Sequence, residues 1–213
     1  MALTIDLWLI HPKPEMCAAF KSRFEGLPNV AVIKSRYEEL PPHDCFVTAA
    51  NSFGIMTAGI DAAVIRVHGT ELMKRFQHRI LNEFLGEQPI GTCLIEPTQN
   101  EQYPFIAHSP TMRAPGSIVG TDKVYMATWA SLIAVYHHKS QCRLEPDAAH
   151  TDINTVVFPA MGAGFGGVPY TEVARQMAAA YRHYLNPPHR MNWDMVASRQ
   201  KAIHYDGKKQ VSR

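Results

Sequence analysis

Residues 44–69 read DCFVTAANSFGIMTAGIDAAVIRVHG and join a strand pattern to a helix pattern through a loop of small residues. The first seven residues, 44–50, are a mostly apolar run bounded by polar residues, which predicts a buried parallel strand. Residues 61–68 and 70–85 have helical patterns separated by Gly69. A strand that leads through such a loop into a helix is the repeating unit of α/β sheets, and ligands bind at these loops.

The rest of the chain alternates in the same way. We expect further strands at residues 3–10, 29–33, 92–96, 104–108 and 153–158. We expect further helices at residues 14–25, 121–139, 169–184 and 191–203. Residues 36–43 are predicted to be a loop and residues 140–151 to be polar and irregular. About six strands alternating with helices predict an α/β fold with a mixed, mostly parallel sheet and helices on both faces. No interdomain linker is visible, so residues 1–213 are predicted to form a single domain.

Composition narrows the class of protein. The 213 residues carry a formal net charge of +2, which argues against a nucleic-acid partner, and the basic pair Lys208-Lys209 is expected to be a solvated terminus. The four cysteines are far apart with no C-x-x-C pair, which favours a reducing, cytoplasmic location. The first residues fit a strand better than a signal peptide, and no apolar run approaches the ~20 residues of a membrane span.

A glycine-rich loop follows the strand expected at 153–158. Residues 160–167 read AMGAGFGG and lead into a helix. Small residues let backbone N–H groups approach a ligand, and a helix N-terminus attracts phosphate, so this loop predicts a phosphate or diphosphate site. A tight connection without a ligand is the alternative. Gly162, Gly164 and Gly167 also match G-x-G-x-x-G, but a dinucleotide fingerprint normally opens the first βαβ unit and has an acid about 20 residues later.

Two polar residues stand out in the first loop. Asn51 offers both donors and acceptors, which suit ribose hydroxyl groups. Asp61 follows ten residues later at a helix start. Taken alone, Asn51 could be a turn residue, and Asp61 could be an acid favoured by the helix dipole.

Three segments together resemble the macrodomain family. Thr48-Ala49-Ala50-Asn51 followed by Gly59-Ile60-Asp61 is similar to the family's N-A-A-N and G-V-D motifs, with the same spacing of ten. Residues 162–169 are similar to S-T-G-[VI]-[YF]-G-x-P, and residues 105–110 to I-H-T-V-G-P. The matches fall in the family's chain order between about residues 44 and 185.

The resemblance implies a three-layer α-β-α fold and a ligand, ADP-ribose, with no cofactor or metal. Asn51, near Gly59 and Ile60, would contact the distal ribose, and Asp61 would position or deprotonate water. Glu38 is the best counterpart of the acid that reads adenine. The diphosphate would lie on the second loop, which consists of Gly162, Ala163, Gly164, Phe165 and Gly166. The implied substrates are mono-ADP-ribosylated proteins or O-acetyl-ADP-ribose.

Two alternatives remain open. One is a module that binds ADP-ribose without hydrolysis, and the other is a pocket for RNA or another nucleotide. The sequence departs from the family at Gly166, where an aromatic residue is expected, while Phe165 lies one position earlier. His108 is expected to have a structural role. A metal site at His137, His138, Cys142 and His150 lacks a supporting second ligand pair.

Overall fold

The computed structural model describes residues 4–144 and 152–207. In this part of the chain six strands form one sheet in the order β2-β1-β6-β3-β5-β4. The strands are β1 (Asp6–Ile10), β2 (Val30–Ile33), β3 (Cys45–Asn51), β4 (Leu94–Pro97), β5 (Phe105–Met112) and β6 (Thr155–Phe158). The helices are α1 (Pro14–Phe24), α2 (Gly59–His68), α3 (Thr70–Phe84), α4 (Lys123–Leu144), α5 (Tyr170–Leu185) and α6 (Trp193–Ile203), with short 3₁₀ helices η1 (Tyr37–Glu39) and η2 (Tyr205–Gly207).

The sheet is mixed and mostly parallel, as predicted. Every neighbouring pair of strands is parallel except β4 and β5, which pair antiparallel. The central pair β3–β5 is in register from Cys45 opposite Phe105 to Ala50 opposite Pro110, and the register then shifts before Asn51. Irregularities of this kind at a strand end re-aim a side chain, and here the affected residue is Asn51.

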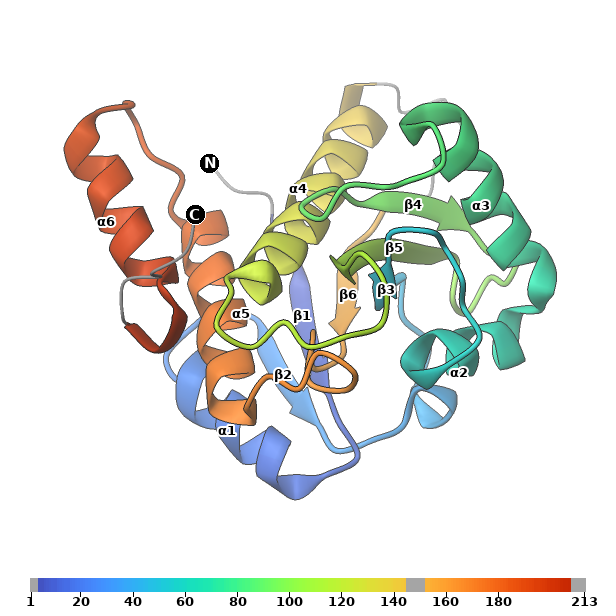
Figure 1. The fold of residues 1–213 in the computed structure, drawn as a ribbon, viewed down its shortest axis with the longest axis horizontal. Helices are drawn as coiled ribbons and strands as arrows, with labels where there is room; N and C mark the ends of the chain where they lie inside the picture. Colours follow the sequence, from blue (N-terminus) through green and yellow to red (C-terminus); the bar gives the residue numbers. More distant parts are fainter. Residues whose placement is uncertain (1–3, 145–151, 208–213) are drawn as a thin grey trace.

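Helices cover both faces of the sheet (Figure 1). One hydrophobic core lies under α1, α4 and α5, and the other lies under α2, α3 and η1. Strand β3 supplies both cores because side chains alternate along a strand. Cys45 and Val47 belong to the first core, and Phe46 belongs to the second. The three-layer α-β-α arrangement is therefore confirmed.

Several element ends differ from the prediction. Helix α4 continues through residues 140–144, which we expected to be irregular. That expectation was wrong for residues 140–144 because polar residues can continue a surface helix, and here Ser140 donates a 2.8 Å hydrogen bond to the Tyr136 carbonyl. The rest of that segment, residues 145–151, lies outside the described residues. Strand β5 continues past His108 to Met112, and a 3₁₀ turn forms in the predicted 36–43 loop.

None of the described helices is long and apolar enough to cross a membrane. The predicted last helix, α6, is present and stands off from the rest of the fold beside α5 (Figure 1). Asn192 caps its first turn through a 2.9 Å bond from the Met195 N–H. Arg175 of α5 holds its other end by donating to the carbonyls of Ala202 and His204, at 2.7 and 2.5 Å.

Candidate functional site

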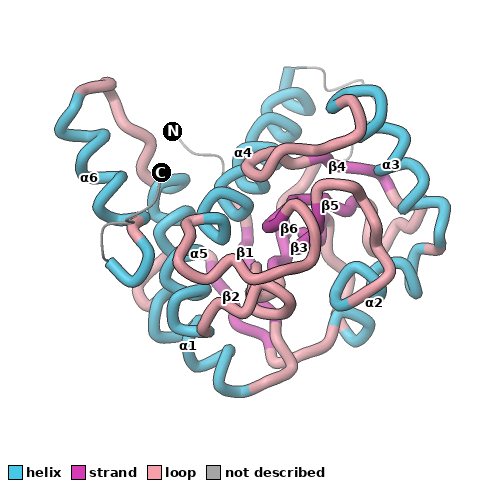
Figure 2. Tube along the Cα trace, viewed as in Figure 1, coloured by secondary structure: helices cyan, strands magenta, loops and turns pink. Residues whose placement is uncertain are grey.

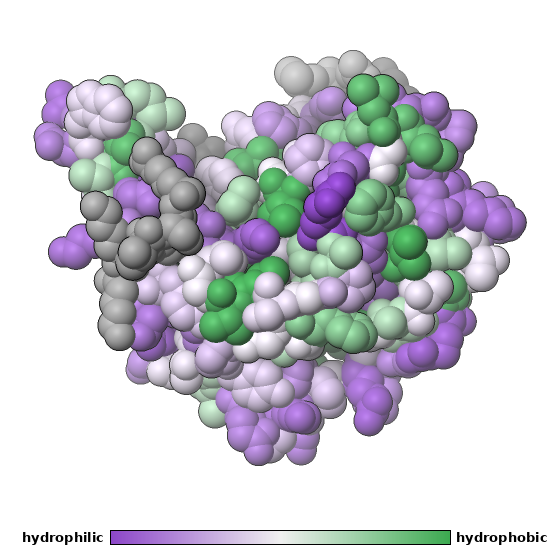
Figure 3. Space-filling view, viewed as in Figure 1, coloured by the Kyte–Doolittle hydropathy of each residue, from purple (hydrophilic) through white to green (hydrophobic). Residues whose placement is uncertain are grey.

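A pocket of about 590 Å³ lies outside the carboxyl ends of the parallel strands. Figure 2 shows the loops that surround it in the middle of the view, in front of the strands. Several hydrophobic side chains gather on this central part of the surface, within a mostly hydrophilic rim (Figure 3). The pocket is lined by every residue that the sequence predicted for the site, namely Glu38, Asn51, Gly59, Ile60, Asp61, Gly162, Ala163, Gly164, Phe165 and Gly166.

Asp61 is a buried acid in the first turn of α2, with 6% of its surface exposed. Its carboxylate accepts a hydrogen bond from the hydroxyl group of Thr48, which is fully buried on β3. Burial raises the pKa of Asp61 to about 6, and the Thr48 hydrogen bond opposes that rise. The carboxylate is therefore ionised at neutral pH and can accept a proton, as a general base must.

The Asn51 side chain forms hydrogen bonds within its own loop, whereas the sequence predicted a contact with a ribose. Its Oδ1 accepts hydrogen bonds from the N–H groups of Phe53 and Ile55, at 3.1 and 3.3 Å. Its Nδ2 donates to the Ile55 carbonyl at 2.8 Å. Asn51 thus holds the loop after β3 in shape, and one of its two amide N–H groups remains for a ligand.

The glycine loop after β6 is packed too tightly for larger residues at two positions. A Cβ atom on Gly162 would lie 2.8 Å from Ile118 Cδ1, and φ there is +76°. A Cβ atom on Gly166 would lie only 2.3 Å from the Gly162 carbonyl oxygen. The aromatic residue that the macrodomain pattern places at position 166 therefore cannot fit this backbone.

Phe165 supplies the aromatic ring instead. It is 62% exposed and lines the pocket. Its ring lies 3.9 Å from the point where a Cβ atom on Gly59 would stand. The Phe165 ring therefore lies close to the first residue of α2.

The same loop offers backbone donors. Within the described residues, the N–H groups of Gly164, Phe165 and Gly166 make no hydrogen bond to the protein. The loop leads through Pro169 into the N-terminus of α5. Successive unpaired N–H groups beside a helix N-terminus form a site suited to phosphate oxygens.

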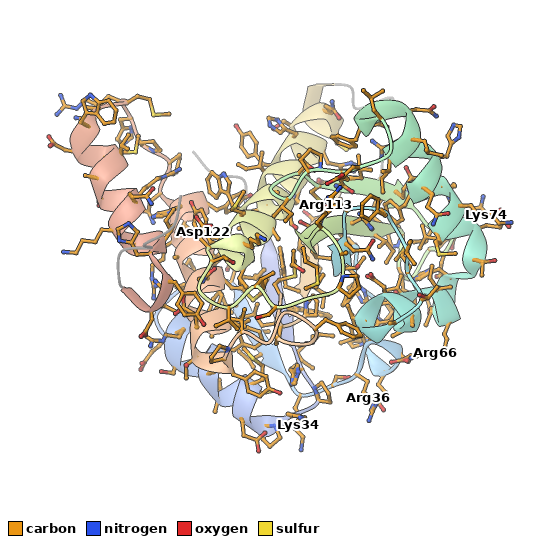
Figure 4. The ribbon with its side chains drawn as sticks, viewed as in Figure 1. Lys34, Arg36, Arg66, Lys74, Arg113 and Asp122 are labelled. Carbon is orange, nitrogen blue, oxygen red and sulfur yellow. The ribbon has the colours of Figure 1, made fainter. Side chains whose placement is uncertain are left out.

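Charged side chains of η1, of the residue before it and of α2 also line the pocket. Glu38 on η1 accepts a 2.6 Å hydrogen bond from Arg66 of α2, and that bond lowers the pKa of Glu38. Arg36 also lines the pocket, and Figure 4 shows it on the same side of the molecule as Arg66. Because Arg66 already engages Glu38, a ligand base that binds here would meet an ion pair rather than a free acid.

The sequence interpretation missed the contributions of two other strand ends. Ile10 is the last residue of β1 and His11 follows it. Thr111, Met112 and Pro115 come from the end of β5 and its following loop. No motif marks them. The only available signal was topological, since the carboxyl ends of parallel strands meet at one edge of the sheet.

His108 does not line the pocket. His108 is fully buried, and its Nδ1 contacts Gln88 Oε1 at 2.7 Å. Burial lowers the pKa of His108 to about 3, so the ring is neutral. Among the described residues no group of three His, Cys, Asp or Glu side chains could hold a metal ion, and His150 lies outside those residues.

Comparisons with known proteins agree with this architecture. The Macro domain family model matches residues 47–177. An uncharacterized protein of Aeropyrum pernix is 31% identical over 137 residues, which cover 64% of this chain and 62% of that relative. A variant of the Oceanobacillus iheyensis macrodomain, determined with ADPR (ADP-ribose), is similar in structure with a TM-score of 0.56 and 19% identity, over 88% of this chain and 83% of its own. The same macrodomain determined with ADP has a TM-score of 0.54 and 22% identity, over 68% and 71%.

Proposed function

The chain belongs to the macrodomain family, and from that premise we propose that its pocket binds ADP-ribose and that Asp61 hydrolyses the bond between ADP-ribose and its acceptor. One observation carries the proposal: a single pocket combines a buried carboxylate with a loop of unpaired backbone N–H groups. The solved macrodomain structures with ADP and ADP-ribose support the choice of ligand.

The proposed binding mode follows from the donors on each side of the pocket. The diphosphate lies on the N–H groups of Gly164, Phe165 and Gly166, because these are oriented donors next to a helix N-terminus. The distal ribose lies between Asn51, Asp61 and the Phe165 ring. The pocket volume of about 590 Å³ is within the ~300–1,000 Å³ range of ligand sites.

In the proposed reaction the ionised Asp61 carboxylate removes a proton from a water molecule. The water oxygen forms a bond to the anomeric carbon of the distal ribose, while the bond from that carbon to the acceptor atom breaks and its electron pair leaves with the acceptor. Thr48 holds the carboxylate in place. A positioned base of this kind contributes ~10²–10⁴-fold to the rate. For this step we propose mono-ADP-ribosylated proteins as substrates. With O-acetyl-ADP-ribose the same water would instead bond to the acetyl carbonyl carbon, while the ester bond to the ribose oxygen breaks and that oxygen leaves with the electron pair and takes up a proton.

The second candidate is a module that binds ADP-ribose without turnover. It is favoured by the Asn51 side chain, which is largely occupied in holding its own loop. We place either activity in the cytoplasm, and the free thiols of Cys17, Cys45 and Cys93 support a reducing compartment.

Calorimetric titration with ADP-ribose, with AMP and NAD as controls, tests the pocket. We expect a Kd near or below ~10 μM, about −7 kcal/mol, and much weaker AMP binding. Asp61→Asn should keep binding yet lose at least ~100-fold in turnover of a mono-ADP-ribosylated protein, whereas Asp194→Asn on the exposed face of α6 should change neither. Full turnover by Asp61→Asn would reject Asp61 as the base, and binding without turnover by the unchanged protein would leave only the binding module. No heat at ~1 mM ADP-ribose would reject both candidates.

A further inference from the structure

Helix α6 presents apolar side chains to solvent. None of its residues is buried. Trp193 is 84% exposed, Met191 beside it is 81% exposed, and Val196 is 42% exposed. A helix of 11 residues is marginal by itself in water. Helix α6 is held through Arg175, through Ile203 at its end and through Arg199, whose guanidinium lies 5.0 Å from the Trp129 ring centre.

The charge of the chain is concentrated in the same region. Residues 182–213 contain seven Lys and Arg against two Asp, a net charge of +5. Residues 1–181 contain fourteen basic and seventeen acidic residues, a net charge of −3. The whole-chain value of +2 therefore averages two segments of opposite sign. Within the second segment, the described residues 182–207 contain four Lys and Arg against two Asp, a net charge of +2.

Two basic side chains of this region are available to a partner. Arg190 and Lys201 are exposed, and neither forms an ion pair within residues 4–144 and 152–207. Trp193 is the first residue of α6, and Arg190 precedes it by three residues. Lys201 lies in the last turn of the helix. A cation therefore lies near each end of α6, the helix that carries the exposed Trp193.

We propose that α6 and the residues leading into it form a docking surface for single-stranded nucleic acid. Arg190 and Lys201 would neutralise phosphates, and an unpaired base would stack on Trp193. Basic residues combined with exposed aromatic rings are the elements that bind single strands without base-edge contacts. The surface is separate from the ADP-ribose pocket, so the proposal does not depend on the proposed hydrolysis.

An anionic membrane is a poorer match for this surface. A helix that lies in a membrane interface buries a continuous apolar face. On α6 the apolar residues are divided, because Ile203 packs against the protein core while Trp193 and Val196 are exposed. A single Trp flanked by cations fits one base and its neighbouring phosphates better than a lipid layer.

Fluorescence anisotropy with a labelled 20-nucleotide oligo(dT), using the full chain, tests the proposal. We expect binding that weakens as salt rises. Trp193→Ala should weaken it roughly tenfold, the effect of losing a stacking interaction of ~1–3 kcal/mol. Arg190→Gln with Lys201→Gln should weaken it and lower the slope of log K against log salt by about 1.4, or ~0.7 per phosphate contact.

Two variants serve as matched controls. Leu81→Ala removes an apolar side chain that is 63% exposed on α3, and Lys34→Gln removes an exposed cation beside β2. Both should bind like the unchanged protein, and circular dichroism checks that α6 remains folded in Trp193→Ala. The proposal is overturned by undetectable binding at 50 mM salt, by equal binding of Trp193→Ala, or by Trp193-dependent binding to phosphatidylserine vesicles with none to oligo(dT).

Discussion

The Asp61 carboxylate destabilises the folded protein when it is ionised, because it is buried away from water. Its pKa is raised from 3.8 to about 6 by burial. Between about pH 4 and pH 6 the folded protein holds this proton more tightly than the unfolded chain does, so the free energy of unfolding falls as pH rises through that window. Above pH 6 the loss is complete.

Asp61→Asn removes the charge and keeps an oxygen that can accept the Thr48 hydrogen bond. At pH 7.4 we expect the variant to be more stable than the unchanged protein by up to about 2–3 kcal/mol, from a shift of about two pKa units. The gain should shrink to nothing near pH 4. Urea unfolding at pH 4, 5, 6 and 7.4 measures the gain, and a variant that is less stable at every pH would contradict the assignment of a destabilising, buried carboxylate.

Thr48 sets the pH at which Asp61 ionises, because its hydroxyl group stabilises the charged form. Thr48→Val keeps the shape and removes the donor, so the pKa of Asp61 should rise further. The acidic limb of the pH profile of kcat/KM should move to higher pH, whereas Thr48→Ser should keep it near pH 6. Titration of the Asp61 carboxyl carbon by NMR gives the same readout without catalysis, and an unmoved titration in Thr48→Val would reject this role.

The glycine loop allows a paired test at the scale of one element. Gly166→Ala would place a Cβ atom against the Gly162 carbonyl and 2.9 Å from Ile118 Cγ1, so the backbone must shift and its N–H groups must re-aim. Gly164→Ala meets nothing within 4 Å, and φ is not positive there. We expect Gly166→Ala to weaken ADP-ribose binding at least tenfold and Gly164→Ala to change it little, as measured by calorimetry. Equal effects of both would show that backbone placement in this loop does not control binding.

Local pattern predicted most elements because strand and helix periods are visible in single segments. It predicted β3 and α2 closely, although α2 begins at Gly59 rather than at Asp61. It missed the 140–144 extension of α4, where helix continuation depends on tertiary contacts. One such contact is the buried Lys139, which donates to the Ile153 carbonyl at 2.9 Å and to Asn154 Oδ1 at 2.7 Å.

The candidate site was predictable only where a motif marked it. Asn51 and Asp61 could be located from their spacing, but the task of Asn51 in its own loop depends on backbone geometry that no spacing encodes. The contributions of His11 and Thr111 depend on strand order. Strand order is a property of the whole molecule, and residue types within one segment do not reveal it.

The two cores cannot separate, because the same strands build both. Strand β3 gives Val47 to one core and Phe46 to the other, and β1 divides its side chains in the same way. Losing either core would strip one face of the shared sheet and expose its apolar residues to water. We therefore propose that residues 1–213 fold as a single domain.

Two tryptophans on opposite faces can test that proposal. Trp8 packs against the core under α2 and α3, and Trp129 packs against the core under α4 and α5. Each of two variants keeps only one of these tryptophans, and both carry Trp193→Phe. Urea unfolding followed by tryptophan fluorescence should give the same midpoint in the two variants. That midpoint should also match the one from far-ultraviolet circular dichroism. Separate midpoints for the two reporters would mean that each face of the sheet unfolds as its own unit, and the single-domain proposal would fail.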